Sequence, residues 1–116
     1  DKKTVSRWGI YKLKKRIDNE NFIINDVIEK PSKKNAPSNK AVIGRYILPK
    51  TIFLKLNHQK PSKGGEIHIT DSIRSLIKDK NKFVAHNFKG KYLDCGTLNG
   101  YIKSGLEISN LWNYVW

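Results

Sequence analysis

The sequence predicts an α/β protein with a mixed sheet and flanking helices, folded as a single unit over residues 1–116. Near the start of the chain, apolar residues alternate with polar ones, as in strands that have one face in a core. Farther along, apolar residues recur at helical spacing in three segments. A chain of 116 residues also has room for one compact domain with a hydrophobic core.

The first two predicted strands form a hairpin. In residues 7–17, apolar and basic side chains alternate with a period of two. A polar turn follows, and residues 22–29 form the second strand. Pro31 ends this strand because proline has no backbone N–H to donate.

The middle of the chain predicts a buried strand and then a helix. Residues 41–48 are apolar on both faces apart from Arg45, which is typical of a strand covered by helices above and below. Pro49 suits the first turn of a helix. The buried stripe of that helix is expected to hold Ile52, Phe53 and Leu56.

Two more helices are predicted, with a short strand at residues 83–88 between them. Thr70 is expected to cap the first of these helices, with Asp71 in its positive first turn. The buried stripe of that helix comprises Ile69, Ile73, Leu76 and Ile77. The last helix runs to the end of the chain, on the spacing of Tyr101, Gly105, Ile108, Trp112 and Val115.

The composition is that of a globular protein with a strong basic excess. The 23 Lys and Arg exceed the 10 Asp and Glu, which gives a net charge of +13. An anionic partner such as nucleic acid or a phosphorylated metabolite would fit this charge. A genome rich in A and T would fit it too, because its codons favour Lys, Ile and Asn. The lysines are scattered along the chain, so a dedicated nucleic-acid surface is not favoured.

Short apolar runs and a single cysteine indicate in which cellular compartment the protein is expected. The longest apolar runs hold about five residues, far below the ~20 that a membrane span needs, so no membrane partner is expected. Cys95 excludes an internal disulfide and suits a reducing cytoplasm, where we expect it to be a small buried residue. The first residue is Asp1, so we expect either a processed chain or a fragment.

The strongest candidate for binding chemistry is the end of the second strand. The Glu29 carboxylate could accept hydrogen bonds from two sugar hydroxyls, and the Lys30 ammonium could meet a phosphate. Pro31 would stiffen the chain beyond them. On three residues alone, ordinary surface charges remain the alternative interpretation.

Two weaker motifs follow. The segment GGEIHITD (64–71) reads best as a helix entry, and His68 is expected to be a packed or surface histidine. The segment DCG (94–96) could place Asp94 on Mg²⁺, which usually takes one or two protein carboxylates together with substrate phosphates.

In order along the chain, these elements form a more specific series. The chain closely resembles the carboxyl-terminal part of bacterial UTP–glucose-1-phosphate uridylyltransferase, also called UDP-glucose pyrophosphorylase. The resemblance covers about residues 4–108 and rests on the motifs VSRWGI (5–10), VIEKP (27–31), APSN (36–39), IGRYIL (43–48), GEIHITD (65–71), DCG (94–96) and GY (100–101).

The resemblance implies the carboxyl-terminal portion of a Rossmann-like nucleotide-diphospho-sugar transferase domain. Such enzymes convert UTP and glucose 1-phosphate into UDP-glucose and pyrophosphate with Mg²⁺, and are usually homo-oligomers. By this pattern Glu29 binds the glucose hydroxyls, and Lys30 binds the sugar phosphate and is the catalytic residue. Gly9 and Val42 line the sugar site, and Asp94 is a metal ligand.

The chain also departs from the family. It lacks the glycine-rich nucleotide loop, and Leu98 stands where the family usually has lysine. The aromatic tail, 111–116, differs as well. We therefore expect a fragment that is inactive or nearly so by itself, or one that pairs with a missing amino-terminal half. A related sugar-1-phosphate nucleotidylyltransferase that uses dTTP, and a basic binding module without catalysis, remain alternatives.

Overall fold

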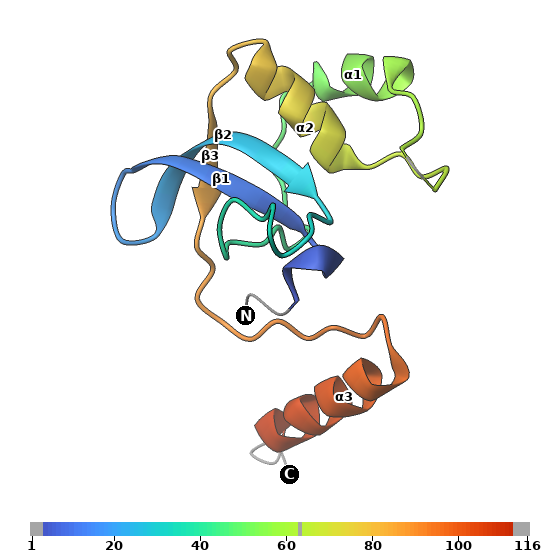
Figure 1. Cartoon of the computed structure of the whole chain (residues 1–116). Coiled ribbons are helices and arrows are strands. Elements are labelled where there is room, and N and C mark those ends of the chain that lie inside the picture. The colour runs from blue at the N-terminus through green and yellow to red at the C-terminus, as the bar shows by residue number, and fades with distance from the viewer. Residues whose placement is uncertain (1–3, 63, 113–116) are drawn as a thin grey trace.

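The computed structural model describes residues 4–62 and 64–112, shown in Figure 1. In chain order the elements are a 3₁₀ turn, η1 (Val5–Arg7), β1 (Gly9–Arg16), β2 (Asn21–Glu29), α1 (Ile52–His58), α2 (Ile69–Lys78), β3 (Phe83–His86) and α3 (Leu98–Trp112). The predicted α/β class with flanking helices is confirmed. Folding of residues 1–116 as a single unit stays a prediction.

The described strands form one antiparallel sheet in the order β1-β2-β3. The predicted hairpin is confirmed, with Gly9 opposite Glu29 and Arg16 opposite Phe22. Every pairing between these strands is antiparallel, so the parallel part of a mixed sheet is not among the described residues.

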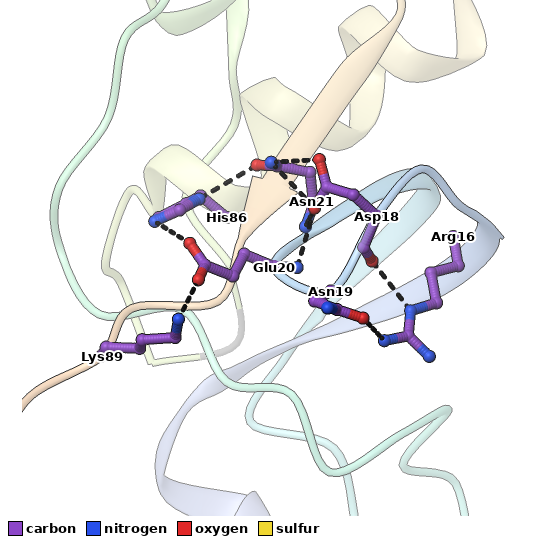
Figure 2. A network of polar contacts seen from close by, with 7 residues as sticks. All are labelled: Arg16, Asp18, Asn19, Glu20, Asn21, His86 and Lys89. Atoms are coloured by element: carbon purple, nitrogen blue, oxygen red, sulfur yellow. Dashed lines mark hydrogen bonds and ion pairs between the residues drawn. The ribbon is translucent and has the colours of Figure 1, made fainter.

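A network of polar contacts holds the hairpin turn and ties it to β3 (Figure 2). The Asp18 carboxylate accepts hydrogen bonds from the side chain of Asn21 and from the backbone N–H groups of Glu20 and Asn21. These bonds lower the pKa of Asp18, the side chain of Asn21 contributing most. Toward β3, Nδ1 of His86 lies 3.0 Å from Oδ1 of Asn21, and Glu20 forms an ion pair with Lys89, just beyond that strand. The network holds the turn, and two irregularities in the strand pairing, between Lys12 and Leu13 and between Leu13 and Lys15, separate it from the Gly9–Glu29 pair at the far end.

The hydrophobic core lies between the sheet and the two middle helices. Its buried members are Val27 of β2, Ile73 and Leu76 of α2, Ile52 of α1, and Val42 of the connecting segment. Figure 1 shows α1 and α2 together on the same side of the sheet. The stripe predicted for α2 is confirmed, because Ile69 and Ile77 pack against this core too.

The buried strand predicted at residues 41–48 is wrong. Only Ala41 makes a bridge, to Ile10, and the segment is otherwise irregular. Gly44 adopts a left-handed φ of 61°, which turns the chain, and Ile47 is fully exposed. Val42 is buried in the core, and its N–H donates to the carbonyl of Gly9, while Tyr46 and Leu48 pack against the core as partly buried side chains.

The first and last helices differ from their predictions in the side chains that they bury. Helix α1 begins three residues after Pro49 and buries Ile52, whereas Phe53 is 66% exposed. Helix α3 forms, but Tyr101 and Ile108 on its predicted stripe are exposed. Figure 1 shows why: α3 lies apart from the sheet, beyond an extended segment. Val115 lies outside the described residues.

Cys95 is exposed, so its predicted burial is wrong. It lies in the irregular segment that leads into α3. Within the described residues, no helix has both the length and the apolar character needed to cross a bilayer.

Tyr11 makes the stability of the fold sensitive to alkaline pH. Burial, and to a smaller degree the neighbouring Tyr46, raise the pKa of Tyr11 to about 12. The folded-state pKa therefore lies above the unfolded value of about 10. The neutral phenol stabilises the fold fully below about pH 10, and this contribution is lost as the pH rises toward 12. We expect the urea midpoint to fall over this range.

In the variant Tyr11→Phe, the urea midpoint should fall less as the pH rises, because phenylalanine has no proton to release. Urea titrations followed by circular dichroism at pH 9, 10 and 11 measure it. Tyr101→Phe, at a tyrosine that is 65% exposed, is the matched control. Equal alkaline sensitivity in the wild-type chain and Tyr11→Phe would contradict the prediction.

Candidate functional site

The end of β2 carries the predicted acid on the face that looks toward α2. Side chains alternate along a strand, so Glu29 lies on the same face as Val27 of the core. Its pairing partner is Gly9, the first residue of β1. Glu29 is half-buried, and its negative charge contributes to the raised pKa of Tyr46, after burial of that phenol.

Gly9 leaves no room for a side chain at this point. A Cβ atom there would lie 2.9 Å from Cγ2 of Thr70, 3.0 Å from Oε2 of Glu29 and 3.2 Å from Cγ2 of Val42. The absence of a side chain thus allows these three side chains to meet over the backbone of β1. Three of the predicted site residues, Gly9, Glu29 and Val42, are therefore neighbours in space.

Thr70 completes this group, in a way that the sequence did not suggest. Helix α2 begins at Ile69 with His68 as its N-cap, so the predicted capping by Thr70 is wrong. Thr70 lies inside the first turn, and its hydroxyl donates to Oε2 of Glu29 at 2.7 Å. A polar residue beside a helix entry could have signalled this contact, but only the sheet brings Glu29 there.

Lys30, the residue after β2, contacts the segment that leads into α2. Its backbone N–H donates to the carbonyl of Trp8, and its φ of 43° is left-handed, which directs the chain away from the sheet. Its Nζ lies 3.4 Å from Oε2 of Glu66, and Nε2 of His68 lies 3.4 Å from the same oxygen. His68 thus contacts a carboxylate at the helix entry, as the packed or surface histidine that the sequence predicts.

The two predicted charged groups therefore point toward one stretch of chain. Glu29 contacts Thr70, and Lys30 contacts Glu66, four residues earlier. A carboxylate can accept hydrogen bonds from hydroxyls, and an ammonium can bind a phosphate. The Lys30–Glu66 pair is exposed, so it contributes little to stability and can exchange for a ligand.

Asp94 lies in a different environment from this group. Its Oδ2 is 3.2 Å from Nη2 of Arg7, and its Oδ1 accepts from the backbone N–H of Gly96 at 3.0 Å. Among the described residues, no three His, Cys, Asp or Glu side chains gather as a metal site. Asp94 therefore fits Mg²⁺ only as a single carboxylate ligand, which suits an ion that takes its other ligands from water and phosphates.

A cavity of about 290 Å³ lies on the Arg7 side of β1. Trp8 and Tyr92 are in edge-to-face contact at its wall, with ring centroids 5.2 Å apart. Glu29 and Lys30 do not line it. Within the described residues, the group around Glu29 thus lies apart from this cavity, with Val42 and Thr70 buried and Glu29 half-buried.

Comparison with known proteins gives the class to which this hairpin and its neighbouring helices belong. Residues 1–110 match the nucleotidyl transferase family, and the chain belongs to that family. Within it, the chain is similar to UTP–glucose-1-phosphate uridylyltransferases, as the motifs predict. It is 47% identical over 83 residues to the one from Pseudomonas aeruginosa, and 38% identical over 103 residues to UTP–glucose-1-phosphate uridylyltransferase 2 from Streptococcus pyogenes.

Solved structures agree with the sequence relatives. The crystal structure of UDP-glucose pyrophosphorylase complexed with UDP-glucose superposes with a TM-score of 0.88 at 40% identity. The match covers 95% of this chain and 41% of that one. UTP-bound UGPase from Acinetobacter baumannii gives a TM-score of 0.74 at 32% identity, covering 93% of this chain and 36% of that one.

The aligned regions amount to 72% and 89% of this chain, but only 29% and 34% of the Pseudomonas and Streptococcus relatives. The chain thus spans about a third of the length of the curated relatives it matches.

Proposed function

We propose that this chain supplies the sugar-phosphate-binding part of a UTP–glucose-1-phosphate uridylyltransferase. One observation carries the proposal: the hairpin register and α2 bring Gly9, Glu29, Val42 and Thr70 into contact, with Lys30 adjacent. Relatives that bear this activity in their names support the choice of reaction.

In this proposal, Glu29 and Lys30 bind opposite ends of glucose 1-phosphate. The carboxylate accepts hydrogen bonds from sugar hydroxyls, and the ammonium leaves Glu66 for the phosphate. The phosphate oxygen then attacks the α-phosphorus of UTP in line, and pyrophosphate leaves. Because two polyanions approach each other, Lys30 offsets part of their repulsion while the hairpin holds the attacking group aligned.

Asp94 is proposed as one ligand of Mg²⁺ in the complete enzyme. When bound, the ion would neutralise charge on the nucleotide phosphates. Asp94 would then exchange its exposed ion pair with Arg7 for the ion. The test is the substitution Asp94→Asn in the chimera described below. If the rate depends on Mg²⁺ as it does without the substitution, Asp94 is not a ligand of the ion.

The expected partners of the chain follow from the same proposal. Glucose 1-phosphate, UTP and UDP-glucose are its small-molecule partners, in a cytoplasmic setting. A second copy or an amino-terminal half would cover the exposed apolar side chains of α3, among them Leu98, Leu106 and Leu111. Light scattering measures the molar mass of the purified chain, alone and mixed with such a half. The mass distinguishes a monomer from a homo-oligomer and from a complex with the amino-terminal half.

A chimera tests the proposed function directly. In it, this chain replaces the matching part of the Pseudomonas aeruginosa uridylyltransferase, whose remaining part provides the segments that this chain lacks. We expect the chimera to form UDP-glucose from UTP and glucose 1-phosphate, and the 116-residue chain alone to form none. A folded chimera that turns over another sugar phosphate or dTTP instead, or nothing, would overturn the proposal.

A further inference from the structure

We propose that Thr70 positions the Glu29 carboxylate for the sugar. This inference rests on the proposed function and adds to it a residue that binds no substrate itself. The Thr70 hydroxyl donates to Oε2 of Glu29 at 2.7 Å, so one oxygen of the carboxylate is held by the protein. Among the described residues, no hydrogen bond reaches the other oxygen, Oε1, which is left to accept from a sugar hydroxyl.

The donor itself is fixed in place. Thr70 is 4% exposed and lies in the first turn of α2, whose next turns bury Ile73 and Leu76 in the core. A threonine in a helix has few side-chain rotamers, because its β-branched side chain meets the preceding turn. The hydroxyl therefore has a defined direction relative to the sheet, and this direction sets the orientation of the carboxylate.

The backbone of Gly9 lies against the same groups from the other side. A Cβ atom at Gly9 would lie 3.0 Å from Oε2 of Glu29 and 2.9 Å from the methyl group of Thr70. The methyl group and the hydroxyl of Thr70 thus have separate contacts, one against β1 and the other with Glu29. Valine would preserve the first contact and remove the second, whereas serine would preserve the second.

The alternative is that Thr70 only stabilises the fold. A buried hydroxyl on the same helix provides the comparison: Ser72 is 2% exposed and donates to Oε1 of Gln59. Removal of either hydroxyl deprives a partner of its donor inside the protein. Only the loss of the Thr70 hydroxyl releases the Glu29 carboxylate. Variants that lack the Thr70 or the Ser72 hydroxyl should therefore both lose stability, but only the Thr70 variant should lose sugar binding.

The test measures binding to the full chain by NMR titration, with glucose 1-phosphate and with inorganic phosphate as the probes. The ratio of the two affinities isolates the hydroxyl contacts of Glu29, because both probes offer a phosphate to Lys30. We expect the wild-type chain to favour glucose 1-phosphate. Thr70→Val should reduce that preference about fivefold, the effect of losing one ordinary hydrogen bond.

Three comparisons complete the test. Thr70→Ser should keep the preference within about twofold, since it retains the hydroxyl. Ser72→Ala should lower the thermal midpoint and leave the preference unchanged. Lys30→Ala should weaken both probes together.

The outcomes separate this inference from the proposed function. If the wild-type chain shows the preference and Thr70→Val keeps it, Thr70 does not position Glu29, and the proposed function stands. If Ser72→Ala reduces the preference as much as Thr70→Val, the effect is structural, and the inference is wrong. If the wild-type chain shows no preference, the role of Glu29 in the proposed function fails, and the inference fails with it.

Discussion

Replacing Glu29 by alanine is expected to lower kcat/KM for glucose 1-phosphate about ten- to a hundredfold in the chimera. The carboxylate makes charge-assisted hydrogen bonds to the sugar in our proposal, and loss of one such contact costs about 1.5–3 kcal/mol. Lys30→Ala should have an effect of similar size, through the phosphate. Steady-state kinetics with glucose 1-phosphate as the varied substrate measure both.

The carboxylate of Glu20 provides the matched control. It lies at the opposite end of the hairpin, where it pairs with Lys89 in the turn network of Figure 2. Glu20→Ala removes a charge of the same sign from the same hairpin and should leave kcat/KM unchanged. Wild-type kinetics in both Glu29→Ala and Lys30→Ala would show that neither residue binds the sugar phosphate.

The largest expected loss of stability comes from Leu76 in α2. This side chain is 2% exposed and packs with Val27 and Ile73 in the core. Leu76→Ala should lower the free energy of unfolding by about 2–5 kcal/mol, because it removes buried methyl groups and leaves a cavity. Urea unfolding of the chain followed by circular dichroism measures the change.

A second leucine provides the control for that substitution. Leu54 is 61% exposed on α1, so Leu54→Ala should change the free energy of unfolding by less than about 0.5 kcal/mol. Similar losses for the two variants would mean that α2 does not pack on the sheet as described.

The hairpin and α2 could be predicted because their patterns are local. Each pattern indicates one buried face: the alternation along residues 7–17 and 22–29, and the helical stripe through Ile73 and Leu76. The segment at 41–48 failed for the opposite reason. Apolar residues do not by themselves decide between a strand and an irregular segment, and here Gly44 has a left-handed φ, so the segment packs Val42, Tyr46 and Leu48 on the core without forming a strand.

The candidate site shows the same division. The sequence placed Glu29 and Lys30 together because they are adjacent in the chain, and the family resemblance added Gly9, Val42 and Asp94. The structure joins Gly9, Glu29 and Val42 around one strand end, pairs Lys30 with Glu66 and leaves Asp94 with Arg7. Thr70 was misread as a cap because capping is a local property, whereas its contact with Glu29 spans 41 positions of the chain.

By itself, the sequence determined the α/β class, the hairpin, the buried face of α2 and the family, since these depend on short-range periodicity and ordered motifs. Only the tertiary structure decided which oxygen of Glu29 is held and which residue holds it. The hydrogen bond from Thr70 exists because the sheet register and the packing of α2 bring two distant segments within 3 Å. No spacing in a sequence encodes a contact that depends on how two separate elements pack.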